Sequence, residues 1–252
     1  MAMMRTANPA LNEQTFDGFT GLAETDKAMT LQGTVNKAGF LLICVLVGSF
    51  WTWYLFFQSP GNPGVVTPWM IGGAIGGLVL ALVTVFKQEW APVTSPLYAL
   101  LEGLFLGAIS AIGEAQYPGI VIQAVGLTFG TCIALLLAYS SRMIKATENF
   151  KLGVVAATGG IAIVYLISIV LSLFGVRIPM IYDNGLVGIG FSIFVVIIAA
   201  LNLVLDFDFI ESGARRGLPK YMEWYAAFGL MVTLIWLYIE ILRLLIKLRS
   251  RD

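Results

Sequence analysis

The sequence predicts an all-α integral membrane protein built as a bundle of seven transmembrane helices. Apolar residues make up 58% of its 252 residues and charged residues only 12%, whereas a soluble domain is nearer half apolar and a quarter charged. The mean hydropathy is +0.87. Because one bilayer span needs about 20 mainly apolar residues, a chain of this length and composition can supply several spans.

Seven apolar segments follow one another along the chain and are separated by short polar loops. They lie at approximately 37–57, 68–86, 94–112, 119–139, 154–174, 186–205 and 221–248. Residues 1–36 are polar and mixed in charge, so we predict an exposed tail there and no cleavable signal peptide. Because the loops are short, residues 37–252 are predicted to form a single transmembrane domain.

The composition argues against several classes of function. The formal net charge is zero, which gives no reason to expect a nucleic-acid partner. The chain has no histidine, so Ser-His-Asp catalysis and zinc chemistry of the HExxH type are excluded. Ser192 ends a Gly-Ile-Gly-Phe-Ser stretch that superficially resembles a serine nucleophile motif, but helix packing explains it better. We predict that the protein is not an enzyme.

The distribution of Lys and Arg predicts a cytoplasmic N-terminus, because cytoplasmic loops carry an excess of basic residues. With the N-terminus inside, ten of the 15 basic residues fall in the tail and in loops on the inner side. The other five are Arg177 and the C-terminal Arg243, Lys247, Arg249 and Arg251. If the last segment did not cross, the C-terminus would also be inside, but the length of that segment favours seven full spans.

Pairs of glycines four residues apart occur in three of the segments: Gly73 and Gly77, Gly103 and Gly107, and Gly126 and Gly130. This spacing lets helices approach each other closely in lipid. We interpret the pairs as positions of intramolecular packing in preference to a dimer interface.

Three carboxylates arrive within six residues after the uncharged segment 186–205, namely Asp206, Asp208 and Glu211. Acids at bilayer depth are rare, because an ionised carboxylate there is costly, and they are functional candidates for that reason. Asp206 and Asp208 end the sixth helix and point about 200° apart, so they cannot both face the bundle. We predict that Asp206 faces inward and that Asp208 and Glu211 form the solvated rim of the helix.

Two further acids lie inside apolar segments. Glu102, in the third segment, has no basic residue within a helical turn. It is either a neutral hydrogen-bonded group that joins helices or part of a polar pathway. Glu240 lies deep in the seventh segment, three residues before Arg243, with which it can form a local ion pair. Glu223 stands beside Trp224 at the start of the same segment, and we interpret it as an ordinary interfacial acid.

The alternative for Glu240 is that it faces Asp206 across the bundle. Two carboxylates in a site of low dielectric constant cannot easily both ionise, so they would share a proton. Such a pair would respond to pH without any histidine. When both carboxylates are ionised they would bind a hard cation well, since calcium prefers several oxygen ligands.

Three stretches, taken in their order along the chain, resemble the motifs of one membrane-protein family. Residues 101–107, Leu-Glu-Gly-Leu-Phe-Leu-Gly, resemble a glutamate-glycine helix, and Asp206 resembles an aspartate at the end of a sixth helix. Residues 237–242, Leu-Tyr-Ile-Glu-Ile-Leu, resemble the Leu-Tyr-Leu-Asp-Ile-Leu motif of a last helix. The chain therefore looks like a bacterial member of the Bax inhibitor-1/YccA family, the transmembrane Bax-inhibitor-motif proteins.

This resemblance covers nearly all of the chain after the tail and implies a seven-helix bundle with the last helix near its centre. It also implies a pH-sensitive calcium leak of the bacterial inner membrane. Asp206 and Glu240 would be its ion-binding and pH-sensing pair, and calcium would be the transported ion without any further cofactor. Asp208, Glu102 and Arg243 are secondary candidates.

The sequence departs from the family pattern at both acids. The second acid is a glutamate where the family has an aspartate, and residues 206–208 read Asp-Phe-Asp where the family usually has Asp-Thr-Gln. Bacterial members are also linked to the regulation of membrane proteases. The alternative function is therefore a non-conducting regulator that binds a membrane quality-control protease or other membrane proteins.

Overall fold

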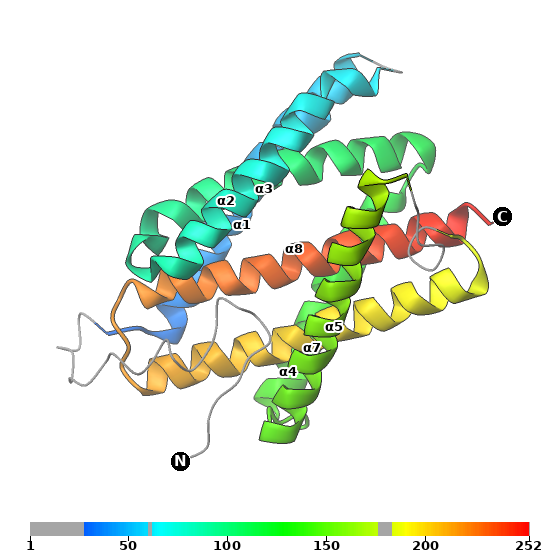
Figure 1. Ribbon diagram of the computed structural model, residues 1–252. Helices are drawn as coiled ribbons and strands as arrows, with labels where there is room; N and C mark the ends of the chain where they lie inside the picture. Colours follow the sequence, from blue (N-terminus) through cyan, green and yellow to red (C-terminus); the bar gives the residue numbers. More distant parts are fainter. Residues whose placement is uncertain (1–27, 60–61, 176–182, 252) are drawn as a thin grey trace. The chain divides into compact units, whose positions relative to one another are not determined.

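The computed structural model describes residues 28–59, 62–175 and 183–251 (Figure 1). Within these ranges it contains seven α-helices and two short 3-10 helices, η3 (Pro63–Val65) and η4 (Gln88–Trp90). The α-helices are α1 (Leu31–Gln58), α2 (Thr67–Phe86), α3 (Ala91–Gln116), α4 (Ile120–Ser140), α5 (Glu148–Leu173), α7 (Leu186–Arg215) and α8 (Met222–Arg249). Each of the seven is long and apolar enough to cross a membrane. The predicted all-α class with seven spans is confirmed.

Helix α1 begins at Leu31, six residues before the first predicted apolar segment. Its N-cap is Thr30, whose hydroxyl accepts a hydrogen bond from the backbone N–H of Gly33 and so satisfies one of the free donors of the first turn. The end of the predicted polar tail is therefore helical. Residues 1–27 of that tail, and Arg177 of the orientation argument, lie outside the described residues.

Helix α7 does not end at Asp206 and Asp208, as the sequence predicts, but continues to Arg215. The apolar run stops near residue 205, yet Phe209 and Ile210 beyond it are still buried. The helix ends shortly before Gly217, which has a positive φ of 65°. Burial of apolar side chains on one face therefore carries the helix past the point where the sequence becomes charged.

The described residues form two compact units. The first unit comprises 28–59, 62–121 and 208–232, and the second unit comprises 122–175, 183–207 and 233–251. Helices α7 and α8 each contribute residues to both units.

In the first unit, α3 packs against both α1 and α2 (Figure 1). Gly103 of α3 lies against the backbone of α1, where an added Cβ would meet the Cα of Gly48 at 3.1 Å. Gly73 of α2 lies against α3, where an added Cβ would meet the carbonyl oxygen of Leu101 at 2.5 Å. The packing role that the glycine spacing predicts is confirmed at these positions, because only a residue without a Cβ permits so close an approach.

The glycine pair on α4 behaves differently. An added Cβ at Gly126 or Gly130 would meet no atom of the described residues within 4 Å. Within the described residues of its own unit, the structure does not bear out a packing role for this pair. The reason is that small residues four apart make a smooth helix face, but they do not determine whether another helix covers it.

In the second unit, helices α5, α7 and α8 meet around a buried apolar cluster. Its buried residues are Ile161, Val195 and Ile198, and Tyr165 and Trp236 pack against them. By contrast, most residues in the most apolar stretches of α4 and α5 are not buried. Their remaining apolar surface would be unfavourable in water, so lipid is the solvent that suits these helices.

Candidate functional site

Asp206 lies in α7 and its side chain is fully buried. Its neighbours Leu205 and Phe207 are buried as well. Asp208 is half-buried, so the two acids differ in exposure in the direction that helical geometry predicts. Because α7 continues to Arg215, the carboxylate of Asp206 lies within the body of a helix and not at its carboxyl end.

The predicted solvated rim is only partly exposed. Glu211 retains 21% of its side-chain exposure and lies 3.9 Å from Arg215, one helical turn further along α7. Asp208 and Glu211 belong to the first unit, whereas Asp206 belongs to the second. The three neighbouring acids of the sequence therefore fall into two different surroundings.

Asn202 is a functional candidate that the sequence argument overlooked. It lies one helical turn before Asp206 on α7 and is buried. Its side-chain amide donates to the hydroxyl oxygen of Thr158 on α5 at 2.9 Å and to the carbonyl oxygen of Ile198 at 2.8 Å. Residues four apart share a helix face, so a polar face runs through this apolar helix. The signal was visible, since Asn202 is the one amide side chain in the segment 186–205.

Glu240 lies in α8 and is 1% exposed. Nη1 of Arg243 lies 3.0 Å from its Oε1 and 3.1 Å from its Oε2. The hydroxyl of Tyr165, on α5, donates to Oε1 at 2.9 Å and accepts from Nη1 of Arg243 at 2.6 Å. The guanidinium group also lies 5.2 Å from the centre of the Tyr165 ring. We call these three residues the Glu240 triad.

The local ion pair between Glu240 and Arg243, one of the two alternatives drawn from the sequence, is present. Both residues lie on α8 with the spacing that permits it. Tyr165 was not anticipated, because it lies 75 residues away on another helix and no spacing connects it to Glu240. Asp206 and Glu240 belong to the same unit, but a proton shared between them stays a prediction.

Lys247 lies one helical turn beyond Arg243 and is the second basic residue of α8 with a partner on another helix. It is buried, and its ammonium group donates to the carbonyl oxygen of Gly188 near the start of α7 at 3.0 Å. In the sequence argument it was one of the outer basic residues. In the structure it joins the last two helices of the second unit.

Glu102 is half-buried on α3, in the first unit. Its carboxylate lies over Gly77 of α2, where an added Cβ would meet Oε1 at 2.6 Å. Gly77 therefore leaves the space that the carboxylate occupies between the two helices. This position agrees with an acid that contacts a neighbouring helix, and a polar pathway through Glu102 stays a prediction.

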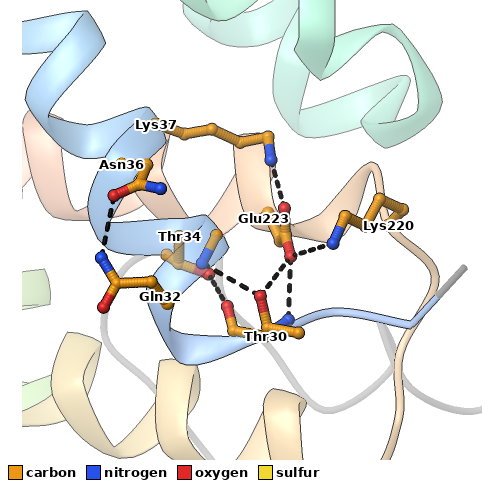
Figure 2. Close-up of polar contacts among 8 residues, drawn as sticks. Thr30, Gln32, Thr34, Asn36, Lys37, Lys220 and Glu223 are labelled. Atoms are coloured by element: carbon orange, nitrogen blue, oxygen red, sulfur yellow. Dashed lines mark hydrogen bonds and ion pairs between the residues drawn. The ribbon is translucent and has the colours of Figure 1, made fainter. Parts of the chain in front are cut away.

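Glu223 is not the ordinary interfacial acid that the sequence suggests, because its side chain is completely buried. Its Oε1 accepts hydrogen bonds from the backbone N–H and the hydroxyl of Thr30 at 2.9 and 2.8 Å. Lys220 lies 3.0 Å from the same oxygen, and Lys37 is paired with Oε2. Figure 2 shows these four groups converging on one carboxylate, and we call them the Glu223 cluster.

The Glu223 cluster joins segments that are almost 200 residues apart. Thr30 caps α1 and Lys37 lies in that helix, whereas Lys220 lies two residues before α8 and Glu223 lies in its first turn. The backbone adds a further link, since the N–H of Met29 donates to the carbonyl oxygen of Leu218 at 2.6 Å. The sequence offers a threonine suited to cap a helix at position 30. No local pattern, however, pairs Thr30 with Glu223.

The described acids do not form a ready calcium site built from several side chains. Within residues 28–59, 62–175 and 183–251, no group of three or more His, Cys, Asp or Glu side chains could hold a metal ion. The oxygen ligands of an ion at Asp206 or Glu240 would have to include backbone carbonyls, hydroxyls or water, all of which calcium accepts.

These features define a helical multi-pass membrane protein with acidic side chains buried inside its spans. A family model described as Bax inhibitor 1 like matches residues 8–250, and the chain belongs to that family. A comparison with curated proteins finds no match.

Proposed function

We propose that this protein is a pH-sensitive cation leak, with calcium as the favoured ion, and that Asp206 and Glu240 are its ion-binding and pH-sensing acids. The observation that carries the proposal is the burial of both carboxylates within one unit of a multi-pass membrane protein. Membership of the Bax inhibitor 1 like family supports it.

The physical argument begins with the cost of charge. An ionised carboxylate within a bilayer is unfavourable unless it is paired, hydrated or neutralised. Asp206 has no exposed surface, and apolar residues flank it in the chain. A bound proton or a bound cation removes that cost, so Asp206 is suited to bind and release either of them.

Calcium suits these acids better than a soft metal does. The polar atoms on this face of α7 are the buried carboxylate oxygens of Asp206 and the buried amide of Asn202, and the half-buried hydroxyl of Thr158 on α5 contacts that amide. Oxygen ligands favour hard cations, and calcium accepts a mixture of carboxylate, carbonyl and water oxygens.

The decisive experiment is calcium flux into liposomes that contain the purified full-length chain. We expect flux above that of empty liposomes, a dependence on pH, and loss of both in the Asp206→Asn and Glu240→Gln double variant. The matched control is Glu148→Gln, which removes an exposed acid at the start of α5 and should behave like the wild type.

Two results would contradict the proposal. A wild-type protein no more permeable than empty liposomes would remove the leak and favour the alternative function, a non-conducting regulator that binds a membrane protease or another membrane protein. Copurification of such a partner from native membranes would then be the next measurement. Unchanged flux in the double variant would remove the site assignment alone.

A further inference from the structure

The Glu240 triad contains its own cation, and we propose that Arg243 is a tethered counter-ion that occupies the cation position of Glu240 and is held there by Tyr165. This inference rests on the proposed function, because it describes how the same site is regulated. A mobile cation could bind Glu240 only after the guanidinium group of Arg243 had withdrawn.

The contacts show that the guanidinium group of Arg243 already occupies the carboxylate oxygens of Glu240. One nitrogen of Arg243 lies within 3.1 Å of both carboxylate oxygens of Glu240. The hydroxyl of Tyr165 uses the same Oε1. A calcium ion would need these oxygen lone pairs as ligands, so the ion and the guanidinium group compete for one carboxylate.

The charge balance points the same way. An arginine side chain does not lose its proton in a protein, so the pair of Glu240 and Arg243 stays neutral as long as the contact persists. Lys247, the next basic residue on this face of α8, interacts with Glu240 through space, but its hydrogen bond goes to the carbonyl oxygen of Gly188. Among the described residues, Arg243 is therefore the basic residue in direct contact with the carboxylate of Glu240.

Tyr165 decides how firmly Arg243 is held. Its hydroxyl accepts from Nη1 at 2.6 Å, and its ring lies beneath the guanidinium group at 5.2 Å. Both contacts favour the cation in this position. Arg243 keeps 36% of its side-chain exposure, whereas Glu240 is enclosed. Movement of the triad would therefore consist of withdrawal of the arginine, and Tyr165 would oppose it.

The competing explanation is a purely structural ion pair that fastens α5 to α8. Both explanations predict a loss of stability when Arg243 is removed, because a buried carboxylate would be left without its partner. They differ in ion binding. A structural pair creates no cation site when it is broken, whereas the removal of a tethered counter-ion exposes one.

Terbium binding provides that readout without any reliance on conduction. Terbium is a hard cation that replaces calcium at oxygen sites, and nearby aromatic side chains sensitise its luminescence. Trp236 lies one helical turn before Glu240, and Tyr165 contacts the carboxylate. The titration would use the purified full-length chain in detergent, with circular dichroism to confirm that each variant is folded.

We expect Arg243→Gln to raise terbium affinity by about tenfold, the change that corresponds to one favourable charge interaction. The added substitution Glu240→Gln should return the affinity to the wild-type value. Arg243→Lys keeps the charge and should stay near the wild type. Arg249→Gln, which removes an exposed arginine of the same helix, should have no effect.

The inference is overturned if Arg243→Gln binds terbium no better than Arg249→Gln does, or if the gain persists after Glu240→Gln is added. Should Arg243→Gln fail to fold, Tyr165→Phe replaces it, since this variant keeps the ion pair and removes only the hydroxyl. A smaller gain in affinity is expected there, and an unchanged affinity counts against the inference.

Flux measured on the same variants separates the two proposals. If terbium binding follows the expected pattern but no variant conducts calcium, the leak is wrong and the tethered counter-ion stands. If the wild type conducts but Arg243→Gln changes neither flux nor terbium binding, the leak stands and the tethered counter-ion is wrong.

Discussion

At the scale of single residues, Glu223 and Glu240 are both buried carboxylates, and basic side chains balance them in different ways. Glu240 has one arginine and a tyrosine hydroxyl around it. Glu223 has two lysines together with the backbone and the hydroxyl of Thr30. The two lysines are not equivalent, because Lys37 keeps 19% of its side-chain exposure and Lys220 keeps 50%.

This difference predicts unequal effects of removing the two lysines. Lys37→Met should destabilise the protein by about 1–3 kcal/mol, the cost of leaving a buried acceptor without its partner. Lys220→Met should cost less, because water can reach the place of a half-exposed ammonium group. Thermal unfolding in detergent measures both changes. Equal effects, or a larger effect at Lys220, would contradict the view that Lys37 is the main partner of Glu223.

At the scale of elements, the start of α1 is docked to the start of α8 by a contact that leaves no room for a side chain. A Cβ added at Gly33 would overlap the carboxylate of Glu223. A Cβ added at Gly39, on the same helix, would meet nothing within 4 Å. These two glycines therefore test whether the close approach, and not glycine as such, matters at this junction.

We expect Gly33→Ala to destabilise the protein by about 1–3 kcal/mol, because the added methyl group must displace a buried carboxylate. Gly39→Ala should be neutral or stabilising by up to about 1 kcal/mol, since alanine favours a helix over glycine. The comparison is made by thermal unfolding of both variants under the same conditions. A neutral Gly33→Ala would show that the junction is looser than its contacts indicate.

At the scale of the whole molecule, the seven helices cross the membrane alternately if each of them spans it. Helix α8 has 28 residues, and at about 1.5 Å per residue it exceeds the roughly 30 Å of a hydrocarbon core. Two of the C-terminal basic residues, Arg243 and Lys247, are engaged by Glu240 and by Gly188. Because these two side chains serve contacts within the protein, they say less about which side of the membrane the C-terminus lies on than basic residues in a loop do.

The proposed orientation, with the N-terminus in the cytoplasm, can be tested by labelling introduced cysteines with a membrane-impermeant reagent in intact cells. Asn62→Cys and Ser250→Cys should be labelled directly, and Ser141→Cys only after the cells are permeabilised. Cys44 and Cys132 would first be replaced by serine. Direct labelling at Ser141 would reverse the orientation, and protection at Ser250 would show that α8 does not cross.

Much of the fold was predictable because it depends on properties that each segment carries by itself. Long apolar runs predicted seven helices, and the close approach at Gly103 followed from glycine spacing in lipid. The burial of Asp206 followed from its apolar neighbours and helical periodicity. The end of α7 was not predictable, because it depends on the burial of Phe209 and Ile210, and no local signal after residue 205 reports that burial.

Composition and periodicity were enough to predict the class of protein, the number of spans and the acids for which an apolar environment makes ionisation costly. Both properties act locally along the chain. The partners that come from other helices depend on the three-dimensional packing. Arg243 is a local partner of Glu240 that the helical spacing predicted. Helix packing brought Tyr165 to Glu240, Thr158 to Asn202, and Thr30 and Lys37 to Glu223. Such contacts join residues from different helices, so they depend on how those helices pack, which a single sequence does not encode in any local pattern.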